Sequence, residues 1–284
     1  MGTYHAGPTR CRLFSSGSRR TFVRGAVPRA HSDYEDGEAF PASTSMAEQY
    51  DRTAAAHYSS YRPPLHQVIL RKALFNKEPF DDGVDVGCGT GYSAVALADH
   101  CLRVYGVEPS QSMLDRAIPH ARITYLKGTG AHIPLPDHSV DVVTFAGSLF
   151  YAKSADLVGE LKRICRSQAV TVAYDFEILL DDVVRLCGVG AKETDMPYDY
   201  AINFSDDPTF REILVGREQV SLELTAAELA HVILSESRYH EAFMERYGLS
   251  DPFAVVKNNL EARGRSHTVR ANIFYSKYET TTDA

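Results

Sequence analysis

The feature that most constrains the fold is the stretch from Val84 to Ser93, which reads Val-Asp-Val-Gly-Cys-Gly-Thr-Gly-Tyr-Ser. Val84 and Val86 are β-branched and suit a strand that is buried on both faces. Glycine then occupies positions 87, 89 and 91, which permits a sharp turn and close approach of a ligand to the backbone. Residues 93–98 favour a helix, whose free N–H groups we expect to face the turn. The pattern predicts a ligand-binding strand–turn–helix unit.

The spacing of the glycines separates two cofactor classes. Dinucleotide enzymes need Gly-x-Gly-x-x-Gly, but here the third glycine comes one residue early and Tyr92 takes its place. Residues 103–107 predict a second strand ending in Glu108, whose carboxylate can accept hydrogen bonds from both hydroxyls of a ribose. An ordinary turn followed by a solvated glutamate is the alternative. Agreement of strand, turn, helix, strand and acid favours a cofactor site.

The segment Asp-x-Gly-x-Gly-x-Gly at 85–91 resembles motif I of the class I S-adenosylmethionine (SAM)-dependent methyltransferases. Residues 128–137 are similar to the loop with which this family bounds the adenine, although Gly130 and Ala131 stand where alanine and glutamate are usual. That departure leaves backbone N–H groups as the expected contacts of the loop. The resemblance covers roughly residues 50–177 and implies SAM as cofactor. The implied cofactor-binding residues are Asp85, Gly87, Cys88, Gly89, Gly91, Glu108, Thr129, Gly130, Ala131 and Ala146.

A further patch, Tyr58-Ser-Ser-Tyr-Arg-Pro63, resembles the N-terminal cap of a methyltransferase group that includes trans-aconitate methyltransferases. Tyr58 and Tyr61, three residues apart, lie on one face of a predicted helix. They either cover the acceptor or form the buried side of that helix. The guanidinium of Arg62 could bind an anionic substrate. The candidate substrate-binding residues are Tyr58, Tyr61, Arg62 and Tyr151.

The implied chemistry is in-line displacement at the SAM methyl, for which the protein mainly aligns the reactants and excludes water. A hydroxyl or ammonium nucleophile needs a base, and Tyr151 and His57 are candidates on position alone. A carboxylate nucleophile needs no base but would need a cation such as Arg62. No histidine spacing indicates a metal site or a catalytic triad. A nicotinamide-dependent oxidoreductase and a non-enzymatic SAM-binding protein remain alternative functions.

Strands alternating with helices predict an α/β fold. We expect a doubly wound, mostly parallel seven-stranded sheet with helices on both faces, the Rossmann-like methyltransferase fold, with a helical cap. A helix is expected at 47–61. The expected strands are 84–86, 103–107, 123–126, 139–146, 169–175, 219–224 and 269–278, with later helices at 226–239, 241–247 and 252–262.

Residues 1–45 differ in composition from the rest of the chain. Residues 1–32 carry six arginines and no acid, so the formal charge of −7 divides into +6 there and −13 for residues 33–284. We expect 1–45 to be a disordered tail and linker. It is either a mitochondrial transit peptide, or the start codon is assigned too far upstream and the protein is cytoplasmic. Residues 46–284 then form the methyltransferase domain, with cap helices at 46–80 and an inserted lid at 176–218.

The net negative charge of residues 33–284 argues against nucleic-acid binding and favours a small-molecule partner. No apolar run in the sequence approaches a membrane span. Five scattered cysteines without a Cys-x-x-Cys pair suggest a reducing compartment. We expect a monomer or a homodimer.

Overall fold

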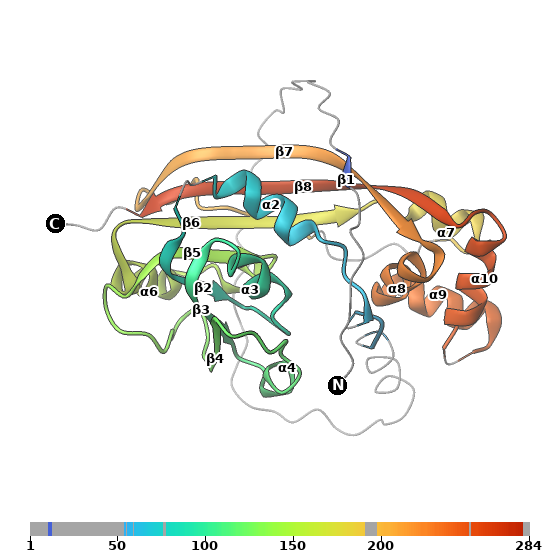
Figure 1. The fold of residues 1–284 in the computed structure, drawn as a ribbon, viewed down its shortest axis with the longest axis horizontal. Coiled ribbons are helices and arrows are strands. Elements are labelled where there is room, and N and C mark those ends of the chain that lie inside the picture. Colours follow the sequence, from blue (N-terminus) through green and yellow to red (C-terminus); the bar gives the residue numbers. More distant parts are fainter. Residues whose placement is uncertain are drawn as a thin grey trace.

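A computed structural model describes residues 11–12, 54, 56–58, 60–75, 78–190, 198–249 and 251–280 of the 284. Its central feature is a single mixed sheet with the strand order β1-β7-β8-β6-β5-β2-β3-β4 (Figure 1). The strands are β1 (Cys11–Arg12), β2 (Phe80–Val86), β3 (Cys101–Glu108), β4 (Ile123–Lys127), β5 (Val140–Ala146), β6 (Cys165–Ile178), β7 (Phe210–Thr225) and β8 (Ser266–Thr280).

The strands β4, β3, β2, β5 and β6 are parallel, whereas β8 runs antiparallel between β6 and β7. These seven strands confirm the predicted methyltransferase sheet, mostly parallel and closed by a reversed strand. The eighth is the two-residue strand β1, which pairs Cys11 with Leu222 and Arg12 with Ser221 of β7. The rest of the predicted tail and linker at 1–45 lies outside the described residues.

Helices cover both faces of the sheet, as predicted (Figure 1). One buried core joins α2 and α3 to the sheet and extends into the C-terminal helices. A second core packs α6 against the opposite face. The helices are α2 (Leu65–Ala73), α3 (Tyr92–Leu97), α4 (Gln111–Leu114), α5 (Leu149–Ala152), α6 (Ala155–Ile164), α7 (Asp181–Leu186), α8 (Ala226–Ser235), α9 (Ser237–Tyr247) and α10 (Phe253–Glu261).

Local sequence explains where these helices begin. The hydroxyl of Ser154 accepts a hydrogen bond from the Leu157 N–H and caps α6. Thr225 and Glu228 form a reciprocal capping box at the start of α8. The predicted helix 226–239 is divided, because Glu236 adopts extended backbone angles and separates α8 from α9.

The predicted lid at 176–218 is shorter than expected. β6 continues to Ile178 and β7 begins at Phe210, so both ends of that range belong to the sheet. These three long strands β6, β7 and β8 reach beyond the rest of the sheet to the group of α7, α8, α9 and α10 (Figure 1). The alternation signal is weak in 210–218 because its side chains are mostly exposed on this edge strand.

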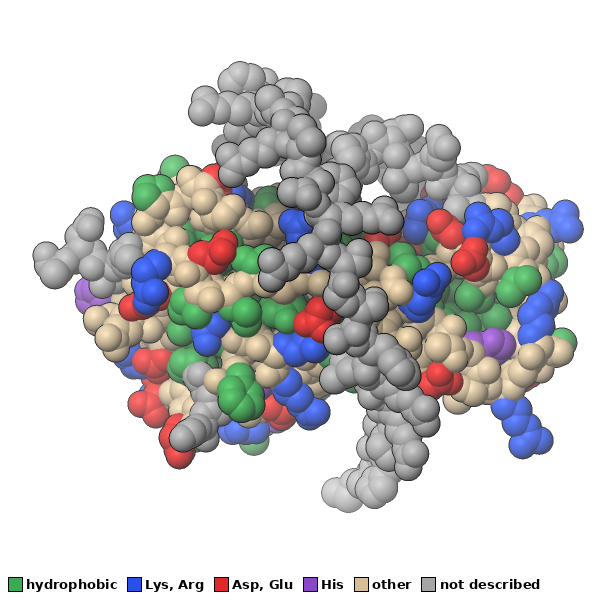
Figure 2. All heavy atoms as spheres, turned by 90° about the horizontal axis from the view of Figure 1, so that it is seen from above, with side chains coloured by type: hydrophobic (Ala, Val, Ile, Leu, Met, Phe, Trp, Pro, Cys, Tyr) green, Lys and Arg blue, Asp and Glu red, His purple; other side chains and the backbone are tan. Residues whose placement is uncertain are grey.

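The expected helix at 47–61 lies mostly outside the described residues, although residues 54, 56–58 and 60 are helical. Figure 2 views the molecule from the side of β7 and shows acidic and basic side chains interspersed with hydrophobic ones. Among the described residues, no helix has the length and apolar character needed to cross a membrane.

Candidate active site

The glycine turn between β2 and α3 is closed on itself by hydrogen bonds. The N–H groups of Gly87 and Cys88 both donate to the carbonyl of Val107, at 2.8 and 3.1 Å, and that of Gly91 donates to Cys88. Gly87 and Gly91 have φ angles of +73° and +90°, which favour glycine. These bonds engage N–H groups of the turn itself, whereas the prediction of free N–H groups concerns the start of the helix, which these bonds do not involve. The turn therefore offers shape and close approach of a ligand to its backbone.

Asp85 supports the turn from inside the core. Its side chain is fully buried and accepts hydrogen bonds from the hydroxyls of Ser93, at 2.5 Å, and Thr144, at 2.8 Å. Burial raises the pKa of this carboxyl to about 6, against the effect of the two hydroxyls. Asp85 does not line the cavity described below, so a direct cofactor contact is not supported by its position.

Glu108 lies at the end of β3, directly beside the turn. One carboxylate oxygen accepts the N–H of Gly89 at 2.9 Å, and the other accepts the N–H of Ser110 at 3.0 Å. Each oxygen keeps lone pairs for further donors. The side chain is 8 % exposed and lines the cavity. The predicted position of the acidic residue is confirmed, and the carboxylate is held with acceptor capacity facing the cavity.

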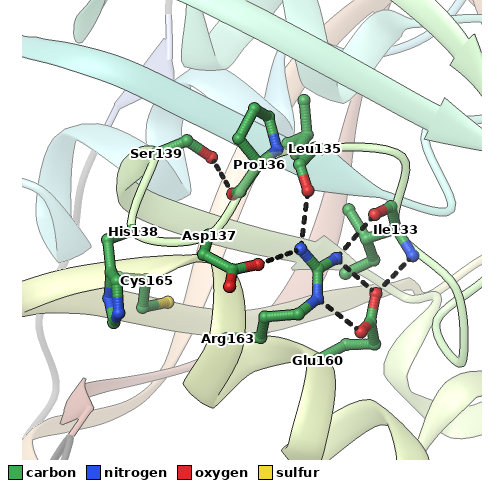
Figure 3. A network of polar contacts seen from close by, with 9 residues as sticks. All are labelled: Ile133, Leu135, Pro136, Asp137, His138, Ser139, Glu160, Arg163 and Cys165. Atoms are coloured by element: carbon green, nitrogen blue, oxygen red, sulfur yellow. Dashed lines mark hydrogen bonds and ion pairs between the residues drawn. The ribbon is translucent and has the colours of Figure 1, made fainter.

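The loop 128–139 is held by Arg163 and Glu160 of α6 (Figure 3). The Arg163 guanidinium donates to the carbonyls of Ile133, at 2.9 Å, and Leu135, at 2.7 Å, and to both oxygens of Glu160, at 2.8 Å. Glu160 in turn accepts the N–H of Ile133 at 2.7 Å. Hydrogen bonding to Arg163 lowers the pKa of Glu160 to about 2, so the pair stays ionised at neutral pH.

This bracing fixes the tip of the loop at the cavity wall. The N–H groups of Thr129 and His132 pair with each other's carbonyls. Those of Gly130 and Ala131 form no backbone hydrogen bond with any residue that the structure describes. Thr129 and Gly130 line the cavity, whereas Ala131 does not. The expected role of backbone N–H groups here fits the geometry.

A cavity of about 760 Å³ lies at the carboxyl ends of the parallel strands. One wall comes from the cofactor motifs: Val86, Gly87, Glu108, Pro109, Gly128, Thr129, Gly130, Ala146, Gly147, Ser148 and Ala152. The other wall comes from distant segments: Tyr58, Arg62, His66, Tyr151, Asp175, Phe176, Glu177, Ile178, Tyr198, Tyr200, Glu236 and Arg238. Parallel α/β sheets bind ligands at this edge, and the volume is typical of small-molecule sites.

Of the expected cofactor residues, Cys88, Gly89 and Gly91 do not line the cavity. The Cys88 side chain is buried and faces Gly106, where a Cβ would lie 2.9 Å from its sulfur. Burial raises the pKa of this thiol well above its usual range, so it is unreactive. These three residues shape the turn that supports the cavity.

The two tyrosines of the N-terminal cap lie in different surroundings. Tyr58 is 38 % exposed, lines the cavity and stacks under the Arg62 guanidinium, which lies 4.0 Å from its ring centroid. Tyr61 packs against the core that joins α2 and α3 to the sheet, and does not line the cavity. Tyr61 therefore lies on the buried side, whereas Tyr58 lies where a residue covering the acceptor would be, and its role in covering the acceptor stays a prediction.

His57 lies away from the cavity and does not support its candidate role as a base. Its Nδ1 is 3.0 Å from Nδ1 of His231, and its ring stacks on Phe253. Its Nε2 lies 3.4 Å from Asp251. Burial lowers the pKa of His57. Tyr151, the other candidate base, does line the cavity and is 79 % exposed.

Several cavity residues escaped sequence reasoning. Asp175 is the last residue of the predicted strand, and Phe176 and Glu177 continue β6 beyond it. Glu236 and Arg238 flank the break between α8 and α9. Tyr198 and Tyr200 fall in the segment predicted to lie over the site, where aromatic residues were the one visible signal. No group of three or more metal-ligating side chains suited to an ion occurs among the described residues.

Comparison with known proteins agrees with this geometry. Residues 84–173 match the family described as "Methyltransferase domain". A probable S-adenosylmethionine-dependent methyltransferase of Saccharomyces cerevisiae is 27 % identical over 133 residues, which cover 44 % of this chain and 45 % of the yeast protein. A Dictyostelium discoideum protein provisionally described as a methyltransferase is 28 % identical over 125 residues, covering 43 % of this chain and 47 % of that protein.

The match to the methyltransferase-domain family covers 90 of the 284 residues. The chain spans about half the length of these curated relatives. A solved structure from Anaeromyxobacter dehalogenans, provisionally described as a type II methyltransferase, shares the fold with a TM-score of 0.57. It is 22 % identical and aligns with 77 % of this chain and 97 % of its own. The resemblance to the class I SAM-dependent methyltransferases is confirmed, and the match favours it over a nicotinamide-dependent oxidoreductase.

Proposed function

We propose that this protein transfers the methyl group of SAM to a small-molecule acceptor bound in the same cavity. The observation that carries the proposal is the continuity of that cavity. Its one wall holds Glu108 and the loop 128–130, and its other wall holds Tyr58, Arg62 and Asp175. A cofactor and an acceptor can therefore meet without crossing solvent, which suits displacement at an activated methyl.

The residues of the cofactor wall fit SAM. Glu108 keeps acceptor capacity on both oxygens for a pair of ribose hydroxyls. The backbone N–H group of Gly130, which lines the cavity, suits the edge of an adenine. Because the turn N–H groups of Gly87, Cys88, Gly89 and Gly91 are all engaged within the protein, they cannot cradle a pyrophosphate. This argues against a nicotinamide dinucleotide.

SAM, when bound, supplies a methyl group on a positively charged sulfur. The acceptor wall would position the nucleophile and exclude water. Tyr58, Tyr198 and Tyr200 offer flat apolar surfaces with polar tips. Arg62 stacks on Tyr58, and its Nε is buried without a hydrogen-bond partner among the described residues. Arg62 therefore suits an anionic group of the acceptor.

The test is a metabolite screen with isotopically labelled SAM, read by mass spectrometry. We expect label to appear in a small molecule when the wild-type protein is present. An Arg62→Ala variant should bind SAM normally and transfer label more slowly at low acceptor concentration. Tight SAM binding with no transfer to any component would instead support a non-enzymatic SAM-binding protein.

A further inference from the structure

Asp175 is a half-buried carboxylate at the boundary between the two walls of the cavity. One of its oxygens accepts the Tyr198 hydroxyl at 2.7 Å, and the other accepts the N–H of Phe176 at 2.7 Å. It packs against the backbone of Gly147, where a Cβ would lie 3.1 Å from the nearer carboxylate oxygen. Gly147 directly follows Ala146, which lies on the cofactor wall. A carboxylate in this position reaches both the cofactor wall and the acceptor wall.

The environment of Asp175 sets its proton affinity near neutrality. Burial raises its pKa to about 6, against the hydrogen bonds from Tyr198 and Phe176 and the positive charge of Arg62. Glu236 across the cavity raises this pKa further, and Tyr174 and Tyr200 also face the carboxylate. A base whose pKa lies near the working pH suits proton abstraction. Each oxygen has a remaining lone pair to accept the proton.

The other charged groups of the acceptor wall are less suited to this role. Glu177 accepts a hydrogen bond from the Asn272 amide at 3.0 Å. His66 is buried against Tyr174, and burial lowers its pKa to about 3. Three carboxylates, Asp175, Glu177 and Glu236, line this wall with two arginines. A carboxylate of the acceptor that acted as the nucleophile would lie beside Asp175 and would be repelled by its charge.

We propose that Asp175 is the general base of the methyl transfer and that the acceptor attacks through a group with a proton to lose, a hydroxyl or an amine. This rests on the proposed function and narrows it, because it excludes a carboxylate as the nucleophile. Tyr198 is the positioning residue that orients the Asp175 carboxylate.

A lone pair on the acceptor oxygen or nitrogen forms the new bond to the methyl carbon, and the bond from that carbon to sulfur breaks with its electron pair remaining on sulfur. The proton on the attacking atom passes to an Asp175 oxygen. Asp175 is neutral after transfer and later releases the proton to solvent.

The experiment incubates the full chain with methyl-labelled SAM and a cell metabolite extract, and then treats the products with base. Methyl esters of carboxylates release labelled methanol, whereas ethers and methylamines keep the label. We expect base-stable label. Label released as methanol overturns the inference but leaves the proposed function intact. No incorporation by the wild-type protein overturns the proposed function and this inference with it.

Variants then assign the base. Asp175→Asn should lower label transfer roughly a hundredfold or more, with SAM affinity by calorimetry within about threefold of wild type. Asp182→Asn is the control, because this exposed carboxylate of α7 does not line the cavity, and its transfer should stay within a few-fold of wild type. Transfer by the wild type should rise with pH through about 6, and Asp175→Asn should lose this rise. Tyr198→Phe should move the midpoint of this rise to a different pH. Equal losses in Asp175→Asn and Asp182→Asn, or an unchanged pH profile in Asp175→Asn, would overturn the assignment.

Discussion

The two walls of the cavity are built in different ways. The cofactor wall comes from residues between 86 and 152 other than Tyr151, a short span in which strand ends and turns follow one another closely. The acceptor wall combines Tyr58, Arg62, His66 and Tyr151 with the end of β6, the segment at 198–200 and the α8–α9 junction. The first wall is set mainly by backbone geometry, whereas the second depends on side chains brought together by long-range packing. Changes to each wall should therefore have separable effects.

The largest expected effect concerns Glu108. Glu108→Ala removes the acceptors for two ribose hydroxyls, each worth about 1.5–3 kcal/mol, so the Kd for SAM should rise at least tenfold. It also frees the N–H groups of Gly89 and Ser110, which should lower the melting temperature. Calorimetric and thermal titrations measure both. Glu108→Gln is the control, since it keeps one carbonyl acceptor and should lose less. An unchanged Kd in Glu108→Ala would show that the ribose lies elsewhere.

The next effect compares two glycines of the same turn. Both Gly91 and Gly89 have positive φ, so alanine at either position costs about 1–2 kcal/mol in backbone strain. A Cβ on Gly91 would overlap the Tyr125 ring, whereas one on Gly89 would meet no atom within 4 Å. Gly91→Ala should therefore unfold at a clearly lower temperature than Gly89→Ala. Equal melting temperatures for the two variants would mean that the turn is not packed against Tyr125.

The ionisation of Asp175 should make the free energy of unfolding depend on pH. Its pKa in the folded protein is raised by burial to about 6, against 3.8 for an unperturbed aspartate. Stability is therefore lost as pH rises between these values, because the unfolded chain releases the proton more readily. Asp175→Asn should be more stable than wild type at pH 8, by on the order of 2 kcal/mol, and no more stable at pH 3.5. Denaturant titrations at both pH values measure this. A stabilisation independent of pH would assign it to packing.

The smallest expected effect is the difference in stability loss between Tyr61 and Tyr58 variants of the N-terminal cap. Tyr61 is half-buried against the core, so Tyr61→Ala should cost about 2 kcal/mol of unfolding free energy. Tyr58 lies at the cavity and is more exposed, so Tyr58→Ala should cost less than about 1 kcal/mol but lower methyl transfer. Chemical denaturation with parallel activity measurements separates the two. The reverse order of stability losses would place Tyr58 in the core instead.

The contrast between the two walls also explains which features could be predicted from the sequence. The strands of the mostly parallel sheet and the position of Glu108 could be predicted, because hydrophobic periodicity and glycine spacing are local signals. The roles of Asp85, Cys88 and Gly91 as internal supports could not, because spacing does not show which atoms a turn uses for itself. Asp175, Glu236 and Arg238 were missed because no local pattern indicates that residues 60 positions apart will face one cavity. His57 was misplaced for the same reason, since its partners His231 and Asp251 are far along the chain.

The most direct measurement of the central claim is a calorimetric titration of the full chain with SAM, and separately with NADH. The turn N–H groups are engaged internally and Glu108 faces the cavity, so SAM should bind at a single site and NADH should give no binding isotherm. The Arg62→Ala variant should reproduce the wild-type SAM isotherm, because Arg62 belongs to the acceptor wall. Binding of NADH without binding of SAM would contradict the account.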